Sequence, residues 1–251
     1  MNEKLKNLFS CIDNTALGGD DTRERIQTLC SRSLEMVDES KGIHPVAAVC
    51  VYSVFVRQAK QLLKDSSIRV ASVAGAFPAG QSPIEVKLKE VEFALREGAD
   101  EIDMVLSRGS FLEGEKAKCF DEIAAIKQCC GTKTLKVILE TGELKTPENI
   151  GEASMLAMEA GADFIKTSTG KIGVGATLQA AECMLKAINK YRQNTSKLVG
   201  FKAAGGISTP EEALAYYELA EHIVGKEMLT NQKFRIGASR LTEKLYSVLT
   251  L

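Results

Sequence analysis

The sequence predicts a single-domain α/β protein with the (β/α)₈, or TIM-barrel, architecture. Short apolar runs rich in β-branched residues alternate with longer amphipathic segments, which is typical of repeated βα units around a parallel sheet. Eight such units fit into the 251 residues, and no Pro-rich or Ser-rich linker divides the chain. We therefore expect one barrel domain over residues 1–251, with an open doubly wound sheet as the structural alternative.

The predicted strands are short runs with the apolar character expected of a buried parallel sheet. In chain order they are Leu8–Asp13, Val46–Tyr52, Arg69–Phe77, Glu101–Leu106, Thr134–Glu140, Asp163–Ser168, Leu198–Ala203 and Phe234–Ala238. Longer segments with helical periodicity lie between them. The clearest are Pro83–Glu97, Phe111–Cys129, Thr146–Ala160, Ala176–Arg192 and Pro210–Glu221.

Helix start and stop signals support several of these boundaries. Thr209 stands before Pro210 and two glutamates, so its hydroxyl can cap a helix whose first turn carries the acids. Gly98 and Gly161 close two other helices and lead into the next strand within a few residues. Such short connections are what repeated βα units require.

Composition and charge narrow the range of partners. Thirty-two basic and thirty-three acidic residues give a net charge of -1, so no global field favours nucleic acid or anionic lipid. The seven cysteines are odd in number and lack zinc-site spacing, which is typical of free thiols in a reducing cytoplasm. No apolar run approaches the roughly 18 residues that span a bilayer. We expect a cytoplasmic protein that acts on small molecules, without nucleic-acid or membrane partners.

Strand parity places ionisable side chains inside the predicted barrel. In Glu101–Leu106 the alternate residues are apolar and suit packing against outer helices, so Asp103 faces the interior. The same alternation turns Lys166 inward in the sixth strand and Lys202 inward in the seventh. These groups lie toward the carboxyl ends of their strands, where the active sites of barrel enzymes are built.

Two further strands add charges by the same parity. The fifth strand leaves Lys136 and Glu140 inside, and the first places Asp13 at its carboxyl end beside an inward Cys11. Ion pairs without a chemical role are the alternative interpretation. Desolvation leaves such buried pairs little net stability, however, so stability alone explains them poorly.

Two inward lysines on neighbouring strands predict imine chemistry. Burial and like-charge repulsion both disfavour the ammonium form, so one of Lys166 and Lys202 becomes neutral near physiological pH. A neutral amine attacks an aldehyde or ketone to form a Schiff base. Asp103 can then move protons, directly or through a water. The residues by themselves leave open which lysine forms the imine.

Glycine-rich turns predict a phosphate site at the same end of the barrel. Gly205 and Gly206 follow the seventh strand, and Gly237 and Ser239 stand at the end of the eighth. Backbone N–H groups and helix amino termini at these two turns commonly hold a phosphate in barrels. Lys171, after the sixth strand, can add a cation from the side. The expected substrate is a phosphorylated carbonyl compound.

Four stretches together resemble the deoxyribose-phosphate aldolases, a family of class I aldolases. They are Glu101-Ile-Asp-Met-Val105, Asp163-Phe-Ile-Lys-Thr-Ser-Thr-Gly170, Gly200-Phe-Lys-Ala-Ala-Gly-Gly-Ile207 and Arg235-Ile-Gly-Ala-Ser239. The stretches Ile12-Asp-Asn-Thr-Ala-Leu17 and Val49-Cys-Val-Tyr52 are similar to the family's first and second strand ends. The resemblance covers most of the chain.

The resemblance implies reversible cleavage of 2-deoxy-D-ribose 5-phosphate to acetaldehyde and D-glyceraldehyde 3-phosphate, without metal or organic cofactor. It also implies a role in deoxyribose phosphate catabolism and a homodimer. By motif position, Lys166 is the Schiff-base lysine, Lys202 its pKa-lowering neighbour and Asp103 the proton-transfer group. The same mapping assigns substrate binding to Asp13, Cys50, Lys171, Gly205, Gly206, Gly237 and Ser239.

Several residues depart from the family pattern. Asn14 stands where many members have histidine, Ser53 replaces a proline, and Arg240 replaces a small hydroxyl residue. Tyr246 lies too early to match the terminal tyrosine that helps proton transfer in some members. We expect these departures to affect the shape of the loops, the affinity for phosphate and the source of the proton that the enamine takes up.

Three other functions fit parts of the pattern. Another Schiff-base aldolase, of the transaldolase or keto-acid lyase type, would share the lysine imine. A pyridoxal-phosphate barrel would also do so, but the sequence offers no clear partner for the pyridine nitrogen. A sugar-phosphate-binding barrel without turnover is the non-enzymatic alternative. Trapping of an imine by borohydride distinguishes this last case from the others.

Overall fold

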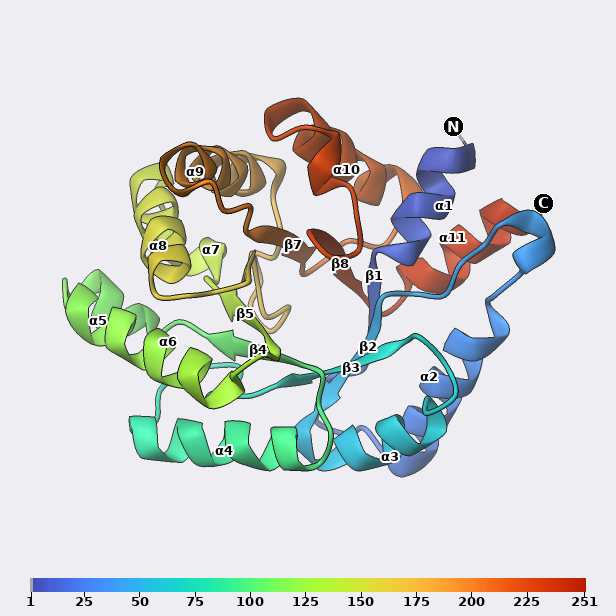
Figure 1. The fold of residues 1–251 in the computed structure, drawn as a ribbon, viewed down its shortest axis with the longest axis horizontal. Coiled ribbons are helices and arrows are strands. Elements are labelled where there is room, and N and C mark those ends of the chain that lie inside the picture. The colour runs from blue at the N-terminus through green and yellow to red at the C-terminus, as the bar shows by residue number, and fades with distance from the viewer. Residues whose placement is uncertain (1) are drawn as a thin grey trace.

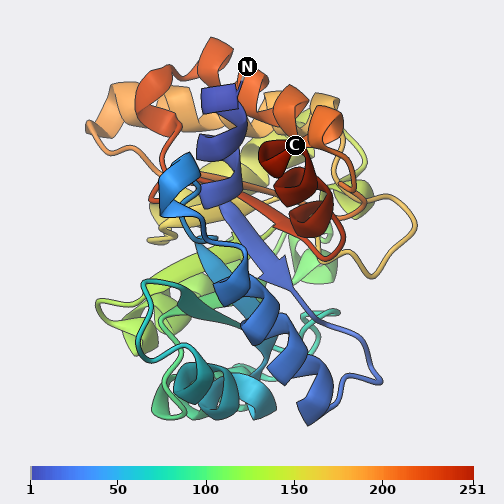
Figure 2. The same cartoon turned by 90° about the vertical axis from the view of Figure 1, so that its right-hand side faces the viewer.

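A computed structural model describes residues 2–251 and shows a closed barrel of eight parallel strands surrounded by helices (Figure 1). Each strand pairs with its sequence neighbour, and β8 closes the barrel by pairing with β1. Helices α1 and α11, near the two termini, lie side by side on the outside (Figure 2). The predicted (β/α)₈ fold is confirmed, and the open-sheet alternative is wrong.

The eight strands are shorter than most of the predicted runs. They are β1 Ile12–Thr15, β2 Ala48–Tyr52, β3 Arg69–Val73, β4 Glu101–Val105, β5 Thr134–Ile138, β6 Phe164–Lys166, β7 Gly200–Ala204 and β8 Phe234–Ala238. The prediction for the first strand was wrong at its start, because Leu8 belongs to helix α1, Asn2–Ser10. Leu5, Leu8 and Phe9 are spaced so that one face of that helix is buried.

The helices cover the outside of the barrel. In chain order they are α2 Arg23–Glu35, α3 Val56–Leu62, α4 Ile84–Arg96, α5 Arg108–Leu112, α6 Lys116–Cys130, α7 Thr141–Leu144, α8 Pro147–Glu159, α9 Leu178–Thr195, α10 Pro210–Ile223 and α11 Leu241–Thr250. Short 3₁₀ helices add η1 Glu39–Lys41, η2 Ser53–Phe55 and η3 Lys226–Met228. No helix within residues 2–251 is long and apolar enough to cross a membrane.

Single residues explain where one predicted helix begins and why another is divided in two. Thr209 caps α10 as expected, since it accepts a hydrogen bond from the Glu212 N–H while the Glu212 carboxylate accepts one from the Thr209 N–H. The predicted helix Phe111–Cys129 is instead the two helices α5 and α6. Gly114, with φ of 86°, breaks the segment between them because helical residues need negative φ.

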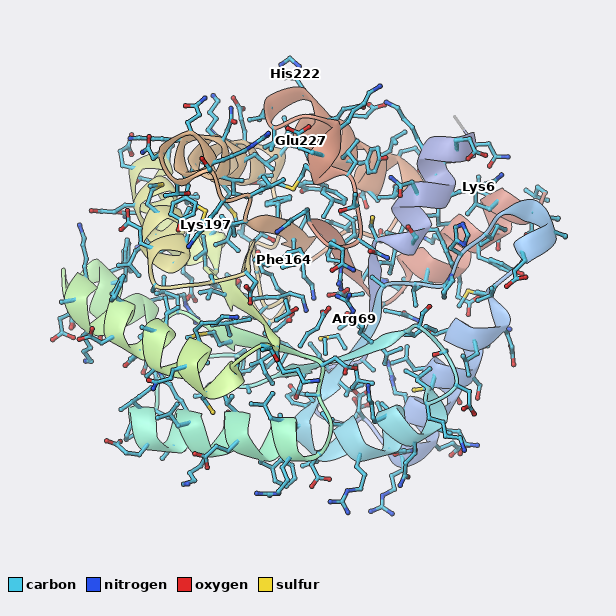
Figure 3. All side chains as sticks on the ribbon, viewed as in Figure 1. Lys6, Arg69, Phe164, Lys197, His222 and Glu227 are labelled. Carbon is cyan, nitrogen blue, oxygen red and sulfur yellow. The ribbon has the colours of Figure 1, made fainter. Side chains whose placement is uncertain are left out.

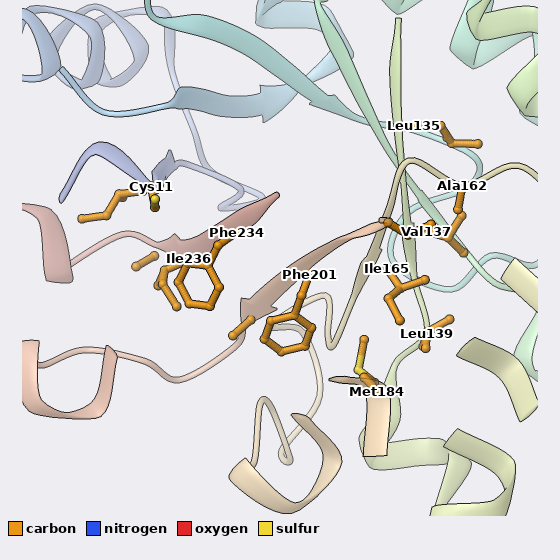
Figure 4. Packing of buried hydrophobic residues seen from close by; sticks show 14 of the residues in the cluster. Cys11, Leu135, Val137, Leu139, Ala162, Ile165, Met184, Phe201, Phe234 and Ile236 are labelled. Atoms are coloured by element: carbon orange, nitrogen blue, oxygen red, sulfur yellow. The ribbon is translucent and has the colours of Figure 1, made fainter. Parts of the chain in front are cut away.

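The main core lies between the outer face of the sheet and the helices. Val137, Ile165, Phe201 and Phe234 point outward into this layer (Figure 4). Cys11, expected to face the interior, packs in the same outer layer because it lies in the turn before β1. Because Val137, Ile165, Phe201 and Phe234 point outward, the alternate positions of β5 to β8 lie inside the barrel.

The inner face of the sheet is divided into an apolar part and a charged part. On β2 and β3 it carries the small cluster Ala48, Cys50, Ala71 and Val73, which Leu17 joins from the loop after β1. Most of the charged residues of the inner face lie on β1 and on β4 to β8, and Arg69 at the start of β3 pairs with Glu101 of β4. Figure 3 shows Arg69 and Phe164 toward the centre of the barrel, whereas Lys197 and His222 lie among the peripheral helices.

Candidate active site

Seven charged side chains meet inside the barrel, and we call them the buried ionic cluster. Its members are Asp13, Glu101, Asp103, Lys136, Lys166, Lys202 and Arg235. Each of them is at most 3% exposed. Because desolvated charges are costly unless paired, the geometry of their ion pairs determines which of them stays charged.

Asp103 lies at the centre of the buried ionic cluster. One of its carboxylate oxygens accepts hydrogen bonds from the Nζ atoms of Lys166 and Lys202, each at 2.8 Å. The other oxygen accepts one from Lys136, also at 2.8 Å. Lys166 and Lys202 are direct partners in the register of β6 and β7, which brings their amines to the same carboxylate. The structure thus brings together the three residues that the sequence predicted as catalytic.

Asp13 is the second carboxylate of the buried ionic cluster. It pairs with Lys202 and accepts a hydrogen bond from Arg235 at 2.5 Å. Its position differs from the prediction, because β1 continues two residues beyond Asp13 to Thr15. Asp13 therefore lies in the middle of the inner face, beside the lysines.

Glu101, Lys136 and Arg235 form the part of the cluster toward the amino ends of the strands. Lys136 pairs with Glu101 at 2.5 Å, and Arg235 donates to both oxygens of Glu101 at 2.8 and 3.2 Å. The Arg235 guanidinium also lies over the Phe164 ring, 5.6 Å from its centroid. Sequence reasoning missed Glu101 and Arg235 as interior residues, although the alternation of their strands contains the signal.

The cluster holds more cations than carboxylates. Four basic residues share three acidic ones, so one cation lacks a full counter-charge. Lys166 has Asp103 as its single acidic partner, and it shares that carboxylate with two other lysines. Lys202 has two acidic partners and Lys136 has three. Lys166 is therefore the least compensated cation.

The pKa values follow this difference in compensation. Burial lowers the pKa of the Lys166 amine, and the Lys202 charge lowers it further, against the opposing effect of Asp103. Burial acts in the same direction on Lys202, but Asp103 and Asp13 outweigh it and raise the pKa of that amine. For Asp103, burial is outweighed by Lys136, Lys166 and Lys202, which hold its pKa well below the ordinary value. Lys166 is thus the lysine poised to lose its proton.

A cavity of about 440 Å³, which we call the mouth cavity, opens above the cluster at the carboxyl ends of β1, β6, β7 and β8. Of the seven cluster residues, Lys166 alone lines it. The other basic residues of its wall are Arg25, Lys171 and Arg240, and none of the described lining residues is acidic. A concave site with several cations and no carboxylate favours an anionic ligand.

The loops after β6 and β7 are held together by close backbone contact. A Cβ atom on Gly175 would lie 2.2 Å from the Gly205 carbonyl oxygen, and one on Gly205 would lie 3.0 Å from Gly175 Cα. Gly205 also has φ of 95°, a conformation that favours glycine. Gly205, Gly206, Gly237 and Ser239 all line the mouth cavity, as the sequence predicted for a phosphate site.

Lys171 extends from the loop after β6 to the loop after β1. Its amine donates a hydrogen bond to the Leu17 carbonyl oxygen at the edge of the mouth cavity. Glu140 supports this loop by accepting hydrogen bonds from the N–H and hydroxyl of Thr169. Glu140 was expected inside the barrel, but it follows β5 with a left-handed φ of 57° and turns to the loop instead.

Of the other residues singled out in the sequence, Cys50 lies beside the cluster, whereas Asn14 and Tyr246 lie away from it. Cys50 is buried on the inner face of β2, and burial raises the pKa of its thiol, so it stays uncharged. Asn14 points away from the site and bonds to Ser33 of α2 and Thr242 of α11. Ser53 begins η2 and does not line the mouth cavity. Tyr246 packs against Phe9, with ring centroids 6.1 Å apart, on the outside of the barrel.

Arg25 is a lining residue that sequence reasoning missed. It lies near the start of the exposed helix α2 and pairs with Asp21 at 2.9 Å. Nothing in the local sequence distinguishes it from other surface arginines. Arg240, noted as a departure from the family pattern, lines the same cavity next to Ser239.

No group of three or more His, Cys, Asp or Glu residues within 2–251 is arranged to hold a metal ion.

Known proteins are similar to this chain in sequence and in fold. The profile of the DeoC/LacD family aldolases matches residues 10–230. The deoxyribose-phosphate aldolase of Homo sapiens is 45% identical over 241 residues, covering 92% of this chain and 76% of that protein. The deoxyribose-phosphate aldolase of Agrobacterium fabrum is 43% identical over 243 residues, covering 96% and 90%. The tetrameric deoxyribose phosphate aldolase of Aeropyrum pernix has a TM-score of 0.76 at 25% identity, covering 98% of this chain and 92% of that one.

Proposed function

Because the chain belongs to the DeoC/LacD family of aldolases, we propose that it reversibly cleaves 2-deoxy-D-ribose 5-phosphate to acetaldehyde and D-glyceraldehyde 3-phosphate. The observation that carries the proposal is the position of Lys166. Its amine is the least compensated cation of the buried ionic cluster, and it alone of that cluster reaches the mouth cavity. A substrate carbonyl in the cavity therefore meets an amine that readily loses its proton.

The first half of the reaction forms the imine. The neutral Lys166 amine attacks the C1 carbonyl carbon of the open-chain sugar, and the carbonyl oxygen takes up a proton to give a carbinolamine. Loss of water then leaves a cationic iminium carbon. Lys166 and Lys202 each donate a hydrogen bond to the same Asp103 oxygen, so Asp103 and Lys202 can relay the protons that these two steps require.

The second half breaks the carbon–carbon bond. A base removes the proton of the C3 hydroxyl, the C2–C3 bond breaks, and its electron pair moves into the iminium to give an enamine on Lys166. Glyceraldehyde 3-phosphate leaves at this point. Protonation of the enamine at C2 and hydrolysis of the imine release acetaldehyde and restore the amine. Asp103, held ionised by Lys136, Lys166 and Lys202, is the base that we assign, directly or through a water.

The mouth cavity would hold the phosphate. Gly206, after β7, leaves room for a close approach of phosphate oxygens to backbone N–H groups, because a Cβ at that position would meet nothing within 4 Å. Lys171 adds an ammonium group, and Ser239 adds a hydroxyl. Asp13 and Cys50, which line the interior beside Asp103, would contact the sugar end of the substrate only through the opening above Lys166.

Trapping of the imine tests this proposal. Incubation with acetaldehyde and borohydride, followed by peptide mapping with mass spectrometry, is expected to show an ethyl adduct on Lys166 and none on Lys202. Lys166→Ala protein should take up no specific label, whereas the matched surface variant Lys197→Ala should label as the wild type does. An adduct on Lys202, or no adduct at all, contradicts the assignment.

Substrate comparison separates the remaining alternatives. We expect cleavage of deoxyribose 5-phosphate to exceed cleavage of ketose phosphates and keto acids. The opposite order would indicate a transaldolase or keto-acid lyase, and binding without an adduct would indicate an inert sugar-phosphate-binding barrel. If the purified protein is yellow and needs pyridoxal phosphate for activity, the cofactor-free mechanism is wrong.

Assembly and cellular role complete the proposal. We assign the enzyme to the catabolism of deoxyribose phosphate in the cytoplasm, acting as a homodimer that folds as one domain over residues 1–251. Val54 and Val86 are apolar side chains that are 69% and 55% exposed, which suits burial in a subunit contact. Sedimentation equilibrium is expected to give twice the chain mass, and a monomer would overturn this part.

A further inference from the structure

Lys136 lies within the buried ionic cluster but away from the mouth cavity. Its amine contacts Asp103 at 2.8 Å, Glu101 at 2.5 Å and Asp13 at 3.6 Å, and its side chain is completely buried. It binds the Asp103 oxygen that Lys166 and Lys202 do not use. Lys136 does not line the cavity, and the Asp103 carboxylate bridges its amine to that of Lys166.

The charge of Lys136 determines how strongly the Asp103 carboxylate can stabilise the ammonium form of Lys166. With Lys166 neutral, the cations Lys136, Lys202 and Arg235 balance the three carboxylates of the cluster. Without the Lys136 charge, two cations would face three carboxylates. Protonation of Lys166 would restore the balance, because an uncompensated buried carboxylate is strongly unfavourable.

We propose that Lys136 is a positioning residue that, together with Glu101, sets the charge balance of the buried ionic cluster so that Lys166 rests as a neutral amine. The inference rests on the proposed function of Lys166 as the imine-forming residue. Lys136 acts through Asp103 and through its own positive charge. Both effects disfavour the ammonium form of Lys166.

The surroundings of Lys136 and Lys166 supply the other charges in this balance. The titratable and charged groups that face the two lysines from the neighbouring strands are Asp13 of β1, Cys50 of β2, Arg69 of β3, Glu101 and Asp103 of β4, Lys202 of β7 and Arg235 of β8. Burial keeps the Cys50 thiol uncharged by raising its pKa. Arg69 is 34% exposed at the Glu101 end, so solvent screens its charge.

Removal of the Lys136 charge and removal of the Glu101 charge are expected to shift the deprotonation of Lys166 in opposite directions. Lys136→Met removes a positive charge and should make Lys166 harder to deprotonate. Glu101→Gln removes a negative charge and should make Lys166 easier to deprotonate. The double variant Lys136→Met/Glu101→Gln leaves two cations and two carboxylates around a neutral Lys166, so it should resemble the wild type. A role for Lys136 in packing alone predicts that the double variant is at least as impaired as Lys136→Met.

The test is the pH dependence of Lys166 labelling in the full-length protein. Acetaldehyde and cyanoborohydride are applied at a series of pH values, and the initial rate of adduct formation on Lys166 is followed by peptide mass spectrometry. We expect the midpoint of the profile to rise by about one pH unit or more in Lys136→Met and to fall in Glu101→Gln. The double variant should return the midpoint close to that of the wild type.

The outcomes separate this inference from the proposed function. An unmoved midpoint in folded Lys136→Met, or a double variant no closer to the wild type than Lys136→Met, overturns the inference. If thermal unfolding shows that Lys136→Met does not fold, Glu101→Gln carries the test, and an unmoved or raised midpoint there overturns it. A wild-type protein whose Lys166 takes no label at any pH refutes the proposed function instead.

Discussion

The buried ionic cluster and the wall of the mouth cavity both gather positive charge, but they hold it differently. Inside the barrel every cation has a carboxylate within 4 Å, and the seven side chains are almost fully shielded from solvent. In the cavity wall, Lys171 and Arg240 face solvent beside glycine-rich backbone, with no acidic residue among the described lining. Two adjacent regions of one barrel therefore use the same residue types for different purposes.

The difference separates chemistry from binding. In the cluster, low dielectric and fixed partners make each charge depend strongly on its neighbours, so removal of one group changes the pKa of another. In the wall, the charges are screened and act mainly by attracting an anion. Cluster variants should therefore change kcat and the pH profile, whereas wall variants should change KM and its dependence on salt.

The largest effect is expected for Lys202→Leu. Loss of the neighbouring charge leaves Asp103 to stabilise the Lys166 ammonium, which raises the pKa of that amine by about one to three units. The neutral fraction at pH 7, and with it kcat/KM, should fall by about 10- to 1,000-fold. The profile of kcat/KM against pH, which reports ionisation in the free enzyme, measures this, with the exposed Lys197→Leu as the control. A profile that falls in height without moving along the pH axis would contradict the explanation.

Gly175→Ala is expected to have the next largest effect, confined to phosphate binding. The added Cβ would meet the Gly205 carbonyl oxygen and separate the two loops that build the cavity wall. We expect KM for deoxyribose 5-phosphate to rise by about 10- to 100-fold, which corresponds to the loss of one or two charge-assisted hydrogen bonds to the phosphate. Gly173→Ala is the matched control, because a Cβ at that position meets nothing within 4 Å. Acetaldehyde trapping on Lys166 should be unchanged in both variants. A loss of trapping in Gly175→Ala would show that the cavity wall also affects the imine chemistry.

Lys171→Ala should raise KM by about tenfold, since one ammonium contact to the phosphate is lost. It should also release the loop after β1 from the hydrogen bond to the Leu17 carbonyl oxygen. The rise should shrink as the salt concentration increases, because screening already weakens the wild-type contact. Steady-state kinetics at two ionic strengths measure it. A lower kcat with unchanged KM would place Lys171 in the chemistry rather than in binding.

The smallest expected effect is that of Arg240→Ser, which restores the small hydroxyl typical of the family. An exposed cation contributes little to binding, so KM should rise only about two- to fivefold. The affinity for inorganic phosphate, measured by competition, should fall by the same factor. Tighter phosphate binding in the variant would show that Arg240 obstructs the cavity rather than lining it productively.

Strand periodicity predicted the fold and much of the site. The barrel class is confirmed, β8 has the predicted bounds, and the family resemblance is confirmed by the matching profile and relatives. Parity also turned Lys166 and Lys202 to the same side of the sheet as Asp103. These features depend on local alternation, which is visible in a single strand.

The partners of each charge could not be predicted in this way. Which lysine is least compensated depends on the stagger between strands, which brings Lys136 of β5 to three carboxylates and Lys166 of β6 to one. Arg25 reaches the cavity from a surface helix and has no local signal. The first strand was misplaced because the apolar residues Leu8 and Phe9 suit a short amphipathic helix as well as a strand.

The most direct test of the account is the ionisation state of Lys166 in the resting enzyme. Protein labelled with ¹³C at the lysine Cε position is titrated by NMR, and Lys166→Met identifies the resonance of interest. We expect this resonance to titrate clearly below the ordinary lysine value of about 10.4, while Lys136 and Lys202 stay protonated beyond it. A Lys166 amine that titrates at or above the ordinary value would contradict the central claim.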